Sequence, residues 1–158
     1  MLNPTAAFCH DRERYYAMLS EADTGTPAGL EAWCLYVLCG ISYELRKVDP
    51  LTKHAFLSSK ILFPALDYSA QRGLINEMAH KVLKKTVSSG TVKAADLKQV
   101  LPAMKAAQIT YQIGKLVDRG LLQPVEQGAR SYTAKFSNSY LIRGVIQTLR
   151  KEGFIPDF

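Results

Sequence analysis

The stretch from residue 92 to 136 constrains the fold most, because two helical patterns and a strand pair follow one another closely within it. Residues 94–101 form a short helix candidate that Pro102 must end, since proline lacks an amide donor and clashes with the preceding turn. Residues 106–119 carry apolar side chains every three or four positions, the period of one helix face, and Gly120 follows them. The repeating positions are Ile109, Ile113, Leu116 and Val117.

A β-hairpin is expected directly after this second helix. Residues 121–126 and 131–136 contain β-forming side chains and flank a turn that includes Gly128. Two short helices, a tight connection and a hairpin predict a winged helix-turn-helix, in which the second helix is the reader and the hairpin is the wing. Residues 91–93 are expected to add a third short strand.

The remaining chain predicts further helices and a mainly α fold class. Helical periodicity and capping residues indicate helices over 11–23, 27–48, 51–73 with a kink at Pro64, 76–88 and 138–152. We therefore expect a helical subdomain over residues 1–73 and a winged-helix domain with a closing helix over 74–158. The helix over 27–48 is expected to be a core helix, because it has a wide apolar stripe. The stripe consists of Leu30, Trp33, Cys34, Val37, Leu38, Ile41 and Leu45.

Positive charge is concentrated in the second half of the chain. The net charge is +6, and residues 93–158 hold ten Lys or Arg against five Asp or Glu, a net +5 that leaves +1 for residues 1–92. This asymmetry is what a nucleic-acid contact needs, although a modest lysine excess is also an ordinary solvated surface. No apolar run approaches the roughly 20 residues that span a bilayer, so we expect a cytoplasmic protein without a membrane partner.

The cysteines and histidines favour neither a disulfide framework nor a metal site. Cys9, Cys34 and Cys39 are odd in number, and no Cys-x-x-Cys or His-x-x-x-His pair occurs. No glycine-rich loop that would cradle phosphates is present either. We therefore expect no metal and no cofactor.

The candidate contact residues lie on the reader helix and the wing. Four side chains lie off the apolar face of the reader helix, and glutamine suits adenine edges while lysine suits guanine or phosphate. Three cations at the helix start and on the wing are candidate phosphate contacts. The competing interpretation is that the same surface contacts a protein partner or a second copy in a homodimer. The candidates are Gln108, Tyr111, Gln112 and Lys115, with Lys105, Arg130 and Lys135 as the cations.

Several blocks of the sequence resemble the C-terminal part of Fic family proteins. They begin with Asn-Pro-Thr-Ala-Ala-Phe-Cys at 3–9, Asp-Arg-Glu-Arg-Tyr-Tyr at 11–16 and Gly-Leu-Glu-Ala-Trp-Cys at 29–34. The blocks at 60–66, 123–132 and 138–144 look like the winged-helix-bearing Fic branch, so the resemblance covers nearly the whole chain.

The resemblance implies a region downstream of a catalytic core. In Fic proteins that core transfers AMP from ATP to a protein hydroxyl with a His-Pro-Phe-x-Asp/Glu-Gly-Asn-Gly-Arg motif, which this sequence lacks. The parent would be a protein adenylyltransferase, whereas this chain alone would not be an enzyme. Its winged unit would contact the Fic core, a target protein or a second copy, and so serve in protein interaction, target recruitment or oligomerisation. A DNA-binding regulatory module is the alternative.

A short motif near the end also matches a Fic pattern. Thr148, Glu152 and Gly153 fit Ser/Thr-x-x-x-Glu-Gly/Asn, the pattern of the inhibitory helix whose glutamate pairs with a catalytic arginine. The pattern is permissive, and in similar proteins that helix usually precedes the core. The alternative is an ordinary helix end closed by Gly153.

Overall fold

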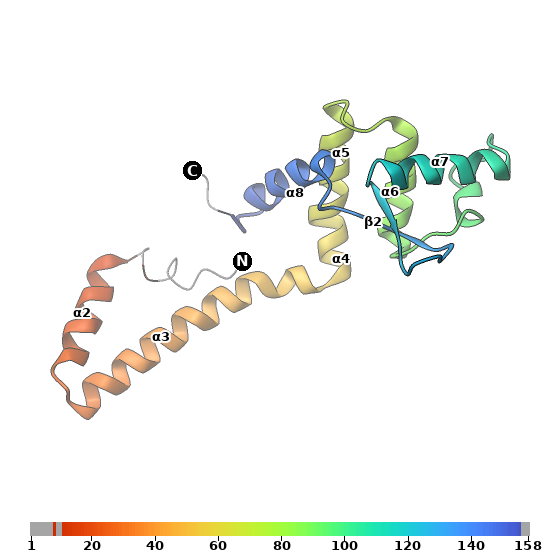
Figure 1. The fold of residues 1–158 in the computed structure, drawn as a ribbon. Coiled ribbons are helices and arrows are strands. Elements are labelled where there is room, and N and C mark those ends of the chain that lie inside the picture. Colours follow the sequence, from red (N-terminus) through yellow and green to blue (C-terminus); the bar gives the residue numbers. More distant parts are fainter. Residues whose placement is uncertain (1–7, 9–10, 156–158) are drawn as a thin grey trace. The chain divides into compact units, whose positions relative to one another are not determined.

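A computed structural model describes Phe8 and residues 11–155 of the chain. The chain divides into two compact units, Met1–Lys53 and His54–Phe158. Both are built from helices, and a two-stranded antiparallel hairpin belongs to the second (Figure 1). The expected mainly α class with a small hairpin is confirmed. Cys9 and most of the sequence block at 3–9 lie outside the described residues.

The first unit is a helical hairpin whose ends were predicted from capping residues. Helix α2 spans Arg12–Asp23, and its N-cap Asp11 accepts a hydrogen bond from the Arg14 backbone N–H at 3.0 Å. Helix α3 spans Pro27–Val48, with Thr26 Oγ1 accepting from the backbone N–H of Gly29 at 3.2 Å. Such caps satisfy amide groups that have no partner within the helix. A 3₁₀ turn, η1, Asp49–Thr52, ends the unit.

Helices α2 and α3 pack through a glycine and an aromatic cluster. A Cβ added at Gly29 would lie 2.4 Å from the carbonyl oxygen of Glu21, so only glycine permits this approach. Nearby, Tyr15 of α2 lies against Trp33 of α3, with ring centroids 5.7 Å apart. Phe8 and Tyr36 extend the cluster at centroid distances of 5.5–6.0 Å.

The expectation that α3 is a core helix is wrong for the described chain. Its only buried residues are Gly29 and Glu44, and four leucines of the expected stripe or its edge are exposed by about half or more. The physical reason is that within this unit only α2 lies along α3, which covers the Trp33 side alone. The exposed leucines are Leu30 (49%), Leu35 (56%), Leu38 (62%) and Leu45 (48%).

The second unit begins with a helix that changes its hydrogen-bonding pattern. A short α4, His54–Phe56, leads into the π-helix η2, Leu57–Leu62, and then into α5, Phe63–Gln71. Pro64 lies in the first turn of α5. The predicted break in the helix at this proline therefore corresponds to the change from the π-helix η2 to α5. Residues 54–71 pack within the second compact unit, which begins at His54.

Helix α5 lies between two neighbours, α6 (Glu77–Ser89) and α8 (Ser139–Lys151). A Cβ added at Gly144 of α8 would lie 2.4 Å from the carbonyl oxygen of Ala65, which shows how closely α8 crosses α5. Ser69 Oγ adds a hydrogen bond to the carbonyl oxygen of Tyr140 at 3.1 Å. These contacts explain why α5 belongs with the helices that follow it.

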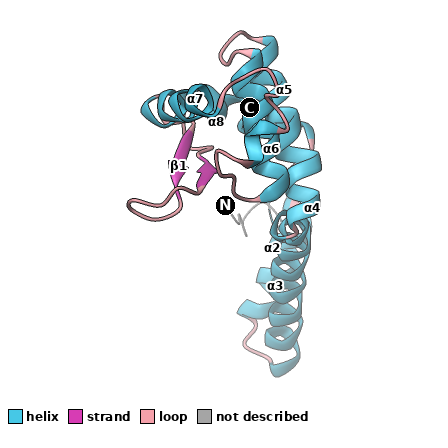
Figure 2. Ribbon diagram, turned by 90° about the vertical axis from the view of Figure 1, so that its right-hand side faces the viewer, coloured by secondary structure: helices cyan, strands magenta, loops and turns pink. Residues whose placement is uncertain are grey.

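Two further helices and a two-stranded hairpin occupy the rest of the second unit (Figure 2), in the order that was expected for a winged helix-turn-helix. Helix α6 is followed by a single bridge between Val92 and Tyr132, a 3₁₀ turn η3 (Asp96–Lys98) and the reader helix α7 (Ala106–Asp118). Strands β1 (Leu122–Pro124) and β2 (Tyr132–Ala134) form the wing, with Gln123 opposite Thr133. The expected helix over 94–101 is only the turn η3, and the expected third strand is only the Val92 bridge.

The hydrophobic core lies in this second unit. Every buried large apolar side chain of the described chain falls between Ile61 and Leu141. Leu66 of α5, Leu83 of α6 and Leu116 of α7 are 2% exposed or less, so the three helices share one core. No helix among the described residues has the length and apolarity needed to cross a membrane.

Candidate functional site

Helix α7 presents a polar face opposite its buried one. Ile109, Ile113 and Leu116 are buried, as the sequence predicted. Tyr111 is 61% exposed, and the Lys115 ammonium lies 4.6 Å from the centre of its ring, a cation–π contact. The structure thus brings two of the predicted contact residues together on the solvent side of α7.

The glutamines of α7 are less available than the sequence suggested. Gln108 Oε1 accepts a hydrogen bond from the Lys105 backbone N–H at 2.8 Å, so this carbonyl oxygen caps the start of the helix. Gln112 is half-buried on the flank of the helix. Bidentate adenine recognition needs both polar atoms of a glutamine amide, and one atom of Gln108 is already engaged.

A hollow of about 520 Å³ opens where α7, the wing and the residues before η3 meet. Lys93 and Arg130 are its two cations, and no acidic residue lines it. Its remaining lining is apolar or weakly polar and consists of two alanines, one isoleucine, one threonine and one tyrosine. These residues are Ala94, Ala95, Thr110, Ile113 and Tyr132.

A second hollow of about 340 Å³ lies on the other side of Arg130 and Tyr132, which line both hollows. Its walls come from the C-terminal half of α7 and from the wing turn, and they include the carboxylate of Asp118. The two hollows therefore differ in charge, since only the second contains an acid.

The cations of the first hollow have no acidic partner. Neither Lys93 nor Arg130 forms an ion pair within the part of the chain that the structure describes. Lys105 and Lys135 are exposed but line neither hollow. Of the three predicted cations, only Arg130 therefore lines the first hollow. The sequence did not identify Lys93 as a contact residue. Its position next to Val92, which was expected to pair with the wing, could have indicated that it lies near Arg130.

The Fic-like motif in α8 has the geometry of a helix end. Thr148 is buried, and its hydroxyl donates to the Gly144 carbonyl oxygen at 2.8 Å. Gly153 has a φ of +75° and donates its N–H to the Arg150 carbonyl oxygen at 2.8 Å, while Glu152 is exposed. These contacts account for Thr148 and Gly153 structurally, and an inhibitory role for Glu152 stays a prediction.

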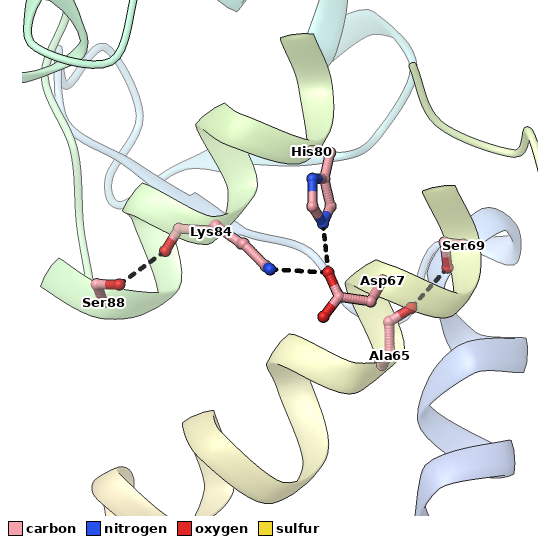
Figure 3. A network of polar contacts seen from close by, with 6 residues as sticks. All are labelled: Ala65, Asp67, Ser69, His80, Lys84 and Ser88. Carbon is pink, nitrogen blue, oxygen red and sulfur yellow. Dashed lines mark hydrogen bonds and ion pairs between the residues drawn. The ribbon is translucent and has the colours of Figure 1, made fainter. Parts of the chain in front are cut away.

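A polar cluster ties α5 to α6 on another part of the unit (Figure 3). Asp67 Oδ1 accepts from His80 Nε2 at 2.7 Å and from Lys84 Nζ at 2.8 Å. Desolvation raises the pKa of Asp67, but the hydrogen bonds and charges of Lys84 and His80 outweigh it and leave that pKa below its usual value. Asp67 also lines a hollow of about 280 Å³ together with Lys60 and Tyr68. Because its hydrogen bonds join α5 to α6, we interpret the cluster as a clamp between these helices.

Among the described residues, no group of three His, Cys, Asp or Glu side chains lies close enough together to hold a metal ion. Cys34 and Cys39 are exposed free thiols of α3. In comparisons with known proteins, no protein-family model matches the sequence and no curated protein matches it either.

Proposed function

We propose that this chain is a non-catalytic C-terminal region of a Fic-type protein adenylyltransferase, and that its first unit docks on the Fic catalytic core. The observation that carries the docking is the open stripe of α3, defined here as Leu30, Cys34, Leu35, Leu38 and Leu45, all exposed. A contiguous apolar patch of this kind marks an interaction site in soluble proteins.

The choice of partner rests on where the resemblance falls. The blocks at 11–16 and 29–34 that look like the Fic C-terminal part lie on α2 and α3, in the unit that carries the open stripe. A helical hairpin downstream of a core, with one apolar face uncovered, fits a segment that completes that core. The apolar stripe would then be buried against apolar side chains, at about 25 cal/mol for each Å² removed from water.

A binding experiment tests this docking. Purified chain is titrated against a Fic-type catalytic core from the same organism, and affinity is measured by calorimetry. Leu38→Glu/Leu45→Glu should weaken binding by at least about thirtyfold, because charge at the centre of a buried interface costs about 2 kcal/mol or more. Ala17→Glu/Ser20→Glu adds the same charge at exposed positions of α2 and serves as the matched control.

Two results would count against the proposal. Equal affinity of both double variants for the core would show that the stripe does not dock there. Light scattering provides the second result. If the parent chain has twice its monomer mass of 17.6 kDa and Leu38→Glu/Leu45→Glu is monomeric, the open stripe forms a homodimer interface instead.

We also propose that the chain alone transfers no nucleotide. The proposal follows from the missing Fic motif and the missing phosphate-binding loop in the sequence. Labelled ATP incubated with the chain and candidate target proteins should leave no label on any protein. Incorporation above that of a reaction without the chain would contradict it.

A further inference from the structure

We propose that the Lys93–Arg130 hollow binds a backbone phosphate of a DNA duplex, with the exposed face of α7 turned to the adjacent major groove. This inference concerns the second unit alone and does not depend on docking of α3. The starting point is the hollow itself, in which two cations face one space of about 520 Å³ that no acidic side chain lines. The nearby Asp96 carboxylate is engaged by the backbone N–H of Lys93 at 2.8 Å and forms no ion pair with the Lys93 ammonium.

The two cations are available for a ligand. Their side chains come from separate segments, Lys93 before η3 and Arg130 in the wing turn, and neither makes an ion pair with a described acid. By contrast, Lys98 donates to the carbonyl oxygens of Pro102 and Met104 at 3.0 and 2.6 Å, and so closes the turn before α7. Lys93 and Arg130 are thus cations around the reader helix that no intramolecular ion pair accounts for among the described residues.

The charge of the whole unit favours a polyanion. Residues 54–158 contain fifteen Lys or Arg and seven Asp or Glu, a net charge of +8. Charge of this size attracts a phosphate backbone over distances comparable to the Debye length. Asp118 lines the second hollow, where it would repel a phosphate, so the first hollow is the one we assign.

The exposed face of α7 favours DNA over a protein partner. Protein interfaces centre on large buried apolar or aromatic anchors. The solvent side of α7 instead carries small and polar residues, with Tyr111 as its one large apolar side chain and Lys115 held against its ring. A helix with such a face suits a major groove, with phosphate contacts at its flank setting the register.

The salt dependence of DNA binding tests the proposal. Anisotropy of a labelled mixed-sequence duplex of about two helical turns is measured with the full chain between about 50 and 200 mM salt. Lys93→Ala/Arg130→Ala should weaken binding and reduce the slope of log K against log salt by about 0.9 for each phosphate that is no longer neutralised. The matched control, Lys60→Ala/Arg143→Ala, removes one Lys and one Arg at exposed sites on η2 and α8 and should retain the parent slope.

The following results would contradict DNA binding at the hollow. Absence of duplex binding by the parent chain, or equal slopes for the two folded double variants, would overturn the proposal. If an acidic peptide of glutamates binds as tightly as the duplex and loses affinity in Lys93→Ala/Arg130→Ala, the hollow is a protein site. Retention of DNA binding by Leu38→Glu/Leu45→Glu is expected, so failure of the docking proposal and failure of this one can be distinguished.

Discussion

The two units use the same device for helix packing but differ in what they bury. In each, one glycine lets a helix approach a neighbouring carbonyl oxygen so closely that a Cβ would lie 2.4 Å away, Gly29 in the first unit and Gly144 in the second. Yet the first unit buries no large apolar side chain among its described residues, while the second has a shared core. Close packing of two helices therefore does not by itself create a core, for which a third element is required.

The two units also differ in net charge. Residues 1–53 contain five Lys or Arg and seven Asp or Glu, a net −2, against +8 for residues 54–158. The first unit therefore presents apolar side chains with little net charge, and the second presents charge over a closed core. Their partners are expected to belong to different chemical classes, and the following experiments test how far the difference extends.

The largest difference is expected for leucine truncation. Leu83→Ala removes a side chain that is 0% exposed and should lower the free energy of unfolding by about 2–5 kcal/mol. Leu38→Ala, at 62% exposure, should change it by less than about 0.5 kcal/mol. Urea denaturation followed by far-ultraviolet circular dichroism measures both. Equal losses would mean that α3 is covered in solution.

The glycine of the second unit is expected to have the next largest effect. Gly144→Ala should destabilise by about 1–3 kcal/mol, because its methyl group would overlap the Ala65 carbonyl oxygen and force α8 away from α5. Gly114→Ala in α7 meets nothing within 4 Å and should stabilise by about 0.5–1 kcal/mol through helix propensity. Thermal unfolding of both variants provides the comparison, and a neutral Gly144→Ala would show that α8 is not held against α5.

Acid should weaken the second unit through the clamp at Asp67. The folded-state pKa of Asp67 is lowered, so its contribution is present above the unfolded pKa near 3.9 and is lost as pH falls through the folded value. The side chain is 42% exposed, so the contribution is at most about 1 kcal/mol. Asp67→Asn should flatten the acid limb of a stability–pH curve, while Glu77→Gln, in an exposed pair with Lys81, should flatten it less. The reverse order would show that the clamp does not stabilise the unit.

The smallest effect on the core is expected from the first unit's glycine. Gly29→Ala should open the α2–α3 contact, because the new methyl group meets the Glu21 carbonyl oxygen. Hydrogen exchange should then quicken in α2 while the amides around Leu83 keep their protection. Faster exchange at both places would show that the two units unfold as one.

Local signals in the sequence predicted most elements of this fold. Asp11, Thr26, Asn76 and Asn138 cap helices as expected, since a cap depends only on residues within one turn. Periodicity identified the buried face of α7 for the same reason. By contrast, the apolar stripe of α3 predicted a buried helix, because periodicity shows which face is apolar and not whether this chain covers it.

The candidate site was predictable only in part. Arg130 was identified from its place in the wing turn. Lys93, which lines the same hollow, is far from it in sequence, and the bridge between Val92 and Tyr132 brings the two segments together. The hydrogen bond from the Lys105 backbone N–H to Gln108 Oε1 was also not predicted, although the spacing of these two residues is that of a capping box. The pairing of residues 91–93 with the wing was expected, but no local signal indicated that the Lys93 side chain would line a hollow with Arg130.

Trp33 is the only tryptophan of the chain, and it lies in the aromatic cluster of the first unit, 5.7 Å from the ring of Tyr15. Its intrinsic fluorescence therefore reports on α2 and α3 and is blind to the core around Leu83. A partner that covers α3 should shift or quench this emission, whereas DNA bound beside α7 should leave it unchanged. One spectrophotometric titration can thus tell which half of the molecule an unknown ligand has reached.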